Sequence, residues 1–214
     1  NDIDGFARLL GASRSKLSGD ANMGVAPHSL RAVTPEELAR LLAMSPTGPV
    51  HIHAAEQVKE VADCVAWSGA RPVEWLLDNA GVDERWCLIH STHLDEREVV
   101  RLAGSGAVAG LCPITEGNLG DGIFPAVDYL AAGGRFGIGT DSNILVDAAQ
   151  ELRVLEYSQR LSQRARALLA REDAPFVGTN LFGYAVAGGA QALGVPAGLA
   201  VGHAADLVSP DLDH

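Results

Sequence analysis

The stretch PVHIHAAEQVKEVADCVAWS (residues 49–68) decides the fold, because a short apolar run is followed at once by a longer amphipathic stretch. Residues 49–54 predict a buried strand, and residues 56–68 predict a helix. Four other apolar runs predict strands, at residues 23–27, 86–90, 107–112 and 135–140. Helical patterns alternate with them, at residues 34–44, 71–78, 95–103, 124–132, 147–170 and 179–193. This alternation predicts right-handed βα units that build a parallel sheet.

Five such strands in 214 residues fall short of the eight strands and ~250 residues of a complete (β/α)₈ barrel. We therefore expect an α/β fold that corresponds to the second half of a TIM-type barrel, about strands 4–8. The tail at residues 202–211 reads as a turn and a further strand outside the barrel pattern.

Composition excludes several classes of partner. The chain has 16 Lys and Arg against 27 Asp and Glu, and its net charge of −11 disfavours binding to nucleic acid. No polybasic run invites an anionic membrane, and no apolar run reaches the ~18 residues of a membrane span. The three cysteines lack metal or disulfide spacing, so a reducing cytoplasm is the expected compartment.

Four polar side chains stand at or just past the carboxyl ends of four predicted strands: His28, His53, His90 and Asp141. The carboxyl ends of barrel strands are where catalytic groups converge. Imidazole nitrogen and carboxylate oxygen together suit Zn²⁺ or Fe²⁺ as the metal. Glu56 follows His53 by three residues, which is where a general acid or base beside the metal is needed.

Each of these residues also has a plainer interpretation. His51 and His53 share one face of a strand, so they can be a buried pair that satisfies hydrogen bonds. Asp141 can be a turn or N-cap residue. Arg31 can bind a carboxylate substrate or form a surface salt bridge. His93 is expected in a loop.

Position in the chain alone indicates the environment of two further regions. His203 and His214 are expected at the surface. The segment at residues 112–122 is loop-like, and its Thr115, Glu116 and Asn118 either contact substrate or belong to a long surface turn.

An ordered set of motifs resembles the deaminase branch of the amidohydrolase superfamily. Within that branch, the resemblance is closest to the deaminases of N-formimino-L-glutamate, and it is weakest over the first 20 residues. The motifs are GVAPHSLRAVTPEEL (24–38), HIHAAEQ (51–57), RPVEWLLDNAGVDERWCLIHSTH (71–93), CPITEGNLGDG (112–122), GIGTDSN (137–143), ELRVLEYSQRL (151–161) and ALGVPAGLAVGHAADLV (192–208).

The resemblance implies a role for each candidate residue. His53, from the fifth barrel strand, is a metal ligand, and Asp141, from the eighth, is both metal ligand and base. Glu56 is the proton shuttle, and His90 orients the attacking water. The remaining two residues, His28 and Arg31, contact the substrate, with Arg31 on a carboxylate.

The resemblance also implies an activity and an assembly. The activity is metal-dependent hydrolysis of N-formimino-L-glutamate, a small acidic substrate, to N-formyl-L-glutamate and ammonia in histidine degradation. One divalent metal, Zn²⁺ or else Fe²⁺, and a homodimer of the full-length enzyme go with it. Residues 1–195 would then be part of the barrel, and residues 196–214 the start of a C-terminal β-sandwich.

Two alternatives remain open at this point. One is another deaminase of the superfamily, acting on guanine or an adenosine derivative, although Arg31 favours an acidic substrate. The other is an inactive barrel fragment, because the family's first-strand HxH ligand pair does not occur in these 214 residues. On that ground the chain alone is expected to bind metal weakly and to lack activity.

Overall fold

A parallel sheet of four strands lies at the centre of the computed structural model, which describes residues 2–19, 21–142, 145–171 and 173–204. The strands follow one another in chain order: β1 (Val50–Ala54), β2 (Trp86–His90), β3 (Val108–Leu111) and β4 (Arg135–Ile138). All three pairings are parallel, so every strand ends at the same edge of the sheet. The α/β class and the parallel sheet are confirmed, as are four of the five predicted strands; β2 has the predicted bounds, and the other three are slightly shorter.

The prediction of a strand at residues 23–27 was wrong in part. This segment runs parallel to β1 but forms isolated bridges, from Val25 to Val50 and from Ser29 to His53. Val25 N donates to Pro49 O, and His51 N donates to Val25 O. The next donor in such a ladder is residue 27, which is a proline without an N–H group. The ladder is therefore interrupted there.

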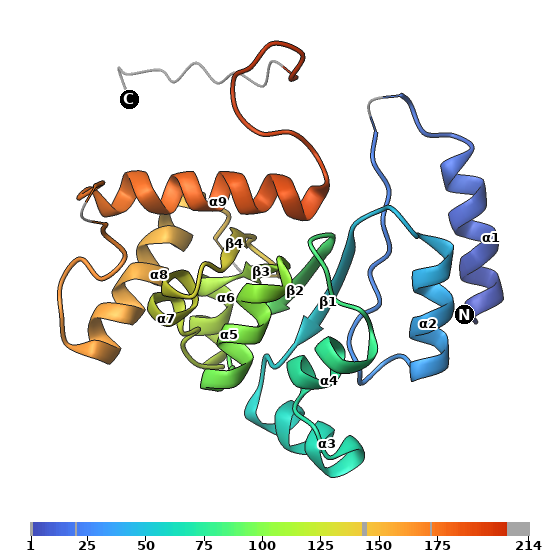
Figure 1. Ribbon diagram of the computed structural model, residues 1–214, viewed down its shortest axis with the longest axis horizontal. Coiled ribbons are helices and arrows are strands. Elements are labelled where there is room, and N and C mark those ends of the chain that lie inside the picture. The colour runs from blue at the N-terminus through green and yellow to red at the C-terminus, as the bar shows by residue number, and fades with distance from the viewer. Residues whose placement is uncertain (1, 20, 143–144, 172, 205–214) are drawn as a thin grey trace.

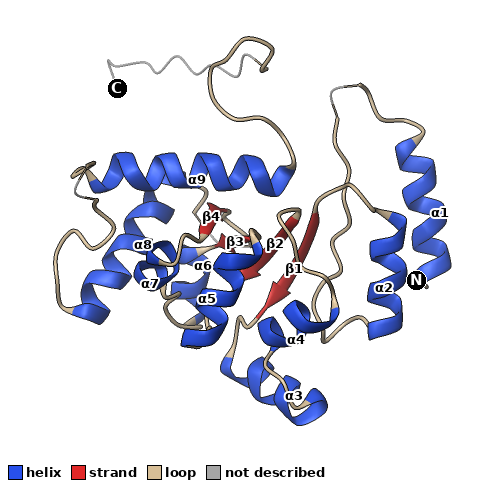
Figure 2. Ribbon diagram, viewed as in Figure 1, coloured by secondary structure: helices blue, strands red, loops and turns tan. Residues whose placement is uncertain are grey.

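Helices surround the strands, as Figures 1 and 2 show. Two of them begin with a capping box, at Thr34 with Glu37 and at Asp95 with Glu98. In these boxes each side chain accepts a hydrogen bond from the other residue's backbone N–H. The helices described are α1 (Ile3–Arg14), α2 (Pro35–Met44), α3 (Val58–Ser68), α4 (Pro72–Asn79), α5 (Glu96–Ser105), α6 (Pro113–Leu119), α7 (Ala126–Ala131), α8 (Ala148–Gln163) and α9 (Val177–Leu193).

The main hydrophobic core lies on one face of the sheet. Ile52, Leu88, Ala109 and Phe136 stand side by side across the four strands in this core. Buried residues of the flanking helices pack in the same core; they include Leu76, Leu102 and Tyr129. Burial of large apolar side chains, at roughly 1.5–3 kcal/mol each, therefore holds the helices on this face.

Helix α9 covers the amino-terminal edge of the sheet. Gln191 Nε2 donates to Glu84 O at 2.9 Å and to Gly106 O at 2.8 Å, both on the approaches to strands. A Cβ on Gly188 would lie 1.9 Å from Phe136 O, so the close contact of α9 with β4 requires glycine. In Figure 1 the strand arrows point away from α9, which lies at the end of the sheet where the strands begin. The carboxyl ends of the strands are left for the candidate site.

Several predicted elements differ from the structure. Helix α1 was not predicted; Asp2 caps it by accepting a hydrogen bond from Gly5 N at 2.6 Å. The loop predicted at residues 112–122 contains α6, because Pro113 stands at the first helical position and starts it. The helix predicted at residues 147–170 ends at Gln163, where Arg164 adopts a left-handed conformation.

The C-terminal segment forms turns and irregular backbone over residues 196–204. The strand predicted within residues 202–211 lies mostly outside the described residues, as does most of the predicted β-sandwich segment. Among the described residues, no helix is long and apolar enough to cross a membrane.

Candidate active site

Three histidines meet at the carboxyl-terminal edge of the sheet. The rings of His28 and His53 are stacked with centroids 4.8 Å apart, and the rings of His53 and His90 are tilted at 5.6 Å. His53 Nδ1 donates to the backbone carbonyl of His28 at 2.7 Å. A neutral His53 with its proton on Nδ1 carries its lone pair on Nε2, which is the nitrogen that a metal needs.

His90 is fully buried at the end of β2 and lies among three carboxylates. Its Nδ1 lies 3.2 Å from Glu116 Oε1. Its Nε2 lies 3.8 Å from Glu56 Oε1 and 3.7 Å from Asp141 Oδ2, and this atom has no hydrogen-bond partner among the described residues. Burial alone would lower the pKa of His90, but the three carboxylates together outweigh burial and raise this pKa.

Glu56 is held by the buried side chain of Glu60, which comes from the first turn of α3. Glu60 Oε1 accepts from Ala55 N at 3.1 Å, and Glu60 Oε2 accepts from Glu56 N at 2.8 Å. The Glu56 carboxylate reaches Arg31, with Nη2 and Oε2 3.3 Å apart. Both predicted interpretations of Arg31 thus remain compatible with its position, because its side chain is paired yet 41% exposed.

Backbone strain is concentrated at the same edge. Ala55, His90, Ser91 and Asp141 are non-glycine residues with positive φ, between 48° and 67°. His90 ends β2, Ala55 and Ser91 directly follow β1 and β2, and Asp141 lies three residues after the end of β4. Such conformations cost of order 1 kcal/mol or more, and they cluster at functional sites because surrounding structure holds them. Here they turn the side chains of His90 and Asp141 toward each other.

Asp141 lies in the turn after β4, with 29% of its side chain exposed. Thr115 Oγ1 donates to Thr140 O at 3.1 Å, which ties the turn to α6. The structure thus brings together His28, His53, Glu56, His90 and Asp141, as the sequence predicted.

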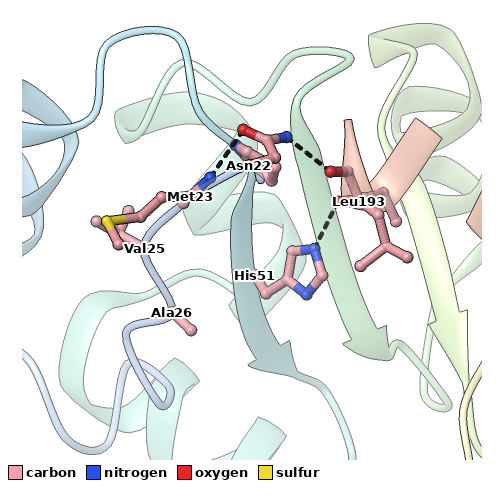
Figure 3. Close-up of a pocket in the computed structure, with 9 residues that line it drawn as sticks. Asn22, Met23, Val25, Ala26, His51 and Leu193 are labelled. Carbon is pink, nitrogen blue, oxygen red and sulfur yellow. Dashed lines mark hydrogen bonds between the residues drawn. The ribbon is translucent and has the colours of Figure 1, made fainter. Parts of the chain in front are cut away.

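His51 lies away from this site. Its side chain shares a face of β1 with His53, as the two-residue spacing predicts, but it points to the end of α9, where Nε2 donates to Ala192 O at 2.7 Å. Figure 3 shows it in a pocket beside Asn22, whose Nδ2 donates to Leu193 O at 2.8 Å. Both histidines of β1 thus hydrogen-bond to a backbone carbonyl, but only His53 does so at the edge where the strands end.

His93 and His203 lie outside the helices and strands. His93 follows β2, and its Nε2 is buried without a hydrogen-bond partner among the described residues. His203 is half-buried, and its Nδ1 donates to Gly198 O at 3.0 Å. His214 lies outside the described residues.

Two glutamates contribute more than the sequence indicated. Glu116 was assigned to a substrate-contacting loop or a surface turn, but it is buried and contacts His90. The sequence pattern indicated no role for Glu60. The available signal was an acidic residue in the first turn of the helix that follows a strand, where it can accept hydrogen bonds from nearby backbone N–H groups.

The part of the chain that the structure describes contains no group of three or more His, Cys, Asp or Glu residues placed to hold a metal ion. The contacts that the structure gives are those of the His53 and His90 rings, 5.6 Å apart, and of His90 Nε2 with Asp141 Oδ2, 3.7 Å apart. The edge therefore offers imidazole nitrogens, carboxylate oxygens and the guanidinium of Arg31.

Comparison with known proteins places this geometry in a family. The model of the amidohydrolase family matches residues 7–214. The chain belongs to the amidohydrolase family.

Individual relatives are similar over almost the whole chain. Formimidoylglutamate deiminase of Pseudomonas aeruginosa is 55% identical over 214 residues, which cover 99% of this chain and 47% of the relative. A 5-methylthioadenosine/S-adenosylhomocysteine deaminase of Natronomonas pharaonis is 34% identical over 201 residues, 91% of this chain and 45% of the relative. The chain thus spans a little under half the length of these curated relatives.

Solved structures agree with the fold. An amidohydrolase from Brucella melitensis superposes with a TM-score of 0.88 at 58% identity, over 91% of this chain and 44% of that one. An adenosine deaminase from Xanthomonas campestris with bound zinc superposes with a TM-score of 0.75 at 29% identity, over 88% of this chain and 43% of that one.

Proposed function

We propose that the protein hydrolyses N-formimino-L-glutamate to N-formyl-L-glutamate and ammonia. The observation that carries this proposal is the convergence of His53, Glu56, His90 and Asp141 at one edge of a parallel sheet, with Arg31 3.3 Å from Glu56. The 55% identity to a formimidoylglutamate deiminase supports this substrate.

We propose further that residues 1–195 form part of a (β/α)₈ barrel, about strands 4–8, with residues 196–214 leading into a β-sandwich. Four parallel strands in chain order, with a fifth segment beside β1, support this arrangement. A homodimer of the full-length enzyme belongs to the same proposal, because the resemblance implies it.

A divalent cation, best Zn²⁺, fits the donors at this edge. His53 Nε2 and the Asp141 carboxylate would hold it, and His90 Nε2 is a buried nitrogen still without a partner among the described residues. Catalytic zinc sites have three protein ligands, so this proposal requires at least one more from residues beyond those described. When bound, such a cation supplies Lewis acidity that lowers the pKa of water toward ~7.

The chain's own residues then bind substrate and move protons. Asp141 and His90 lie together to accept the proton of the attacking water. Glu56 carries a proton to the leaving nitrogen, so that ammonia departs from the tetrahedral centre. Arg31, with His28 nearby, binds a carboxylate of the substrate, and that carboxylate competes with Glu56 for the guanidinium.

A second candidate is deamination of an adenosine derivative, which the 34% identity to a 5-methylthioadenosine/S-adenosylhomocysteine deaminase favours. 5-Methylthioadenosine, the first substrate in the name of this relative, has no carboxylate for Arg31 to bind. The side-chain charge of Arg31 therefore distinguishes the two candidates.

Ammonia release from a substrate panel, measured on the protein at its full natural length, tests the proposal. We expect release from N-formimino-L-glutamate, a higher KM in Arg31→Met and a smaller increase in Arg31→Lys. Glu56→Gln should abolish turnover and leave metal content unchanged. Release from the adenosine derivative instead, unaffected by Arg31→Met, would overturn the assignment.

A further inference from the structure

Glu116 is a buried carboxylate that contacts His90, whereas most carboxylates in proteins lie at the surface. It is 4% exposed and stands in the first turn of α6. One of its oxygens, Oε1, accepts from Cys112 N at 2.9 Å and lies 3.2 Å from His90 Nδ1. This interaction joins the end of β2 to the segment that follows β3.

The two contacts at Oε1 determine which atom donates. A carboxylate has no proton to donate, so Oε1 of the Glu116 carboxylate accepts both from Cys112 N and from His90 Nδ1. Nδ1 must therefore carry the proton of a neutral His90 ring. A neutral imidazole with its proton on Nδ1 keeps its lone pair on Nε2.

His90 Nε2 is the nitrogen that faces the candidate site. It lies 3.8 Å from Glu56 Oε1 and 3.7 Å from Asp141 Oδ2, and it has no hydrogen-bond partner among the described residues. With the opposite tautomer, Nε2 would present a proton to the site and have no lone pair to offer. The tautomer thus decides whether His90 can accept a proton there.

We propose that Glu116 is a positioning residue that holds the neutral His90 ring with its proton on Nδ1, so that the lone pair of Nε2 faces the site. The contribution of His90 to turnover rests on the proposed function above, whereas the tautomer itself does not. Left-handed backbone at His90, with φ of 67°, sets the ring direction, and Glu116 sets the position of its proton.

Nitrogen NMR of the metal-free protein at its full natural length, labelled with ¹⁵N-histidine, tests the tautomer directly. The signal of His90 is identified by its loss in His90→Asn, and it is recorded above the pH at which the ring becomes neutral. We expect a protonated Nδ1 and an unprotonated Nε2. A protonated Nε2 in the wild-type protein would overturn the proposal, whatever the variants do.

Two substitutions separate the acceptor from the packing. Glu116→Gln keeps an oxygen acceptor, so the Nδ1-protonated form should persist, with kcat reduced by less than tenfold. Glu116→Leu fills similar volume without an acceptor, so the proton should move to Nε2 and kcat should fall by about 10²–10⁴, with little change in KM. An unchanged tautomer in folded Glu116→Leu would contradict the inference.

These readouts also separate the two proposals. If the NMR result is as expected but N-formimino-L-glutamate releases no ammonia, the positioning by Glu116 stands and the proposed substrate is wrong. If ammonia is released but Glu116→Leu retains both the tautomer and kcat, the substrate stands and the positioning is wrong.

Discussion

Removal of the Glu60 carboxylate should loosen the turn that carries Glu56. Glu60→Ala deletes the acceptors of two backbone N–H groups, those of Ala55 at 3.1 Å and Glu56 at 2.8 Å. Ala55 has a φ of 53°, so the turn depends on these bonds to hold a left-handed residue. The side chain of Glu60 is 3% exposed, and water cannot readily replace the lost acceptors.

The magnitude follows from the number of bonds and their charge. A hydrogen bond to a charged group contributes about 1.5–3 kcal/mol, so two contribute about 3–6 kcal/mol to the free energy of unfolding. The Arg31 guanidinium, 4.0 Å from Glu60 and 41% exposed, adds little. The loss is large beside a total stability of about 5–15 kcal/mol.

Urea unfolding and amide hydrogen exchange measure the two consequences. We expect Glu60→Ala to lower the free energy of unfolding by this amount and to speed exchange at the amides of Ala55 and Glu56. Glu60→Gln, which keeps one oxygen acceptor, should lose about half as much. A loss under 1 kcal/mol in Glu60→Ala, with both amides still protected, would refute the assignment of these bonds to the turn.

Three further predictions concern the rest of the fold. Gly188→Ala puts a Cβ 1.9 Å from a backbone oxygen of β4 and should lower the free energy of unfolding in urea by about 1–3 kcal/mol. Gly183→Ala, in open space on α9, should raise it by about 0.5–1 kcal/mol. Equal effects of the two substitutions would contradict the close packing of α9 on β4. Thr34→Ala removes the hydroxyl that accepts from Glu37 N and should lower the free energy of unfolding by about 1 kcal/mol. Thr34→Ser keeps a hydroxyl and should retain this stability. No loss in the alanine variant would refute the capping role of Thr34. Burial raises the pKa of Cys87 from 9.0 to about 12. Between these pH values the folded state keeps a thiol proton that the unfolded state releases. The free energy of unfolding that is present below pH 9 is therefore partly lost as the pH rises toward 12. Relative to Cys87→Ala, the wild-type protein should lose about 1.4 kcal/mol per pH unit in this range, and parallel pH curves for the two proteins would show this to be wrong.

The strands and the edge of the site could be predicted because both follow from local patterns. Buried parallel strands read as short apolar runs, as in WCLIH at residues 86–90. Because parallel strands all end at one edge, residues that follow them, such as His53, His90 and Asp141, must converge there. No contact between distant residues has to be known for this step.

Other features depend on opposing or distant signals. The glycines at residues 117 and 120 favour a loop, yet Pro113 starts a helix there and Gly120, with a φ of 73°, ends it. The bond of Glu116 to His90 spans 26 residues of sequence and arises from the folded arrangement of β2 and α6. The spacing HxH predicts a shared face of the strand for His51 and His53. It does not reveal that His51 donates a hydrogen bond to Ala192 O of α9.

The left-handed residues at the strand ends imply a conflict between selection for heat resistance and selection for turnover. At Ala55 and Ser91, glycine would adopt the same backbone without steric cost, so libraries screened for thermal tolerance should be enriched in glycine at these two positions. Glycine would also widen the range of conformations open to the neighbouring side chains. Variants recovered by heat alone should therefore turn over substrate more slowly, and second rounds selected for activity should restore residues with a Cβ.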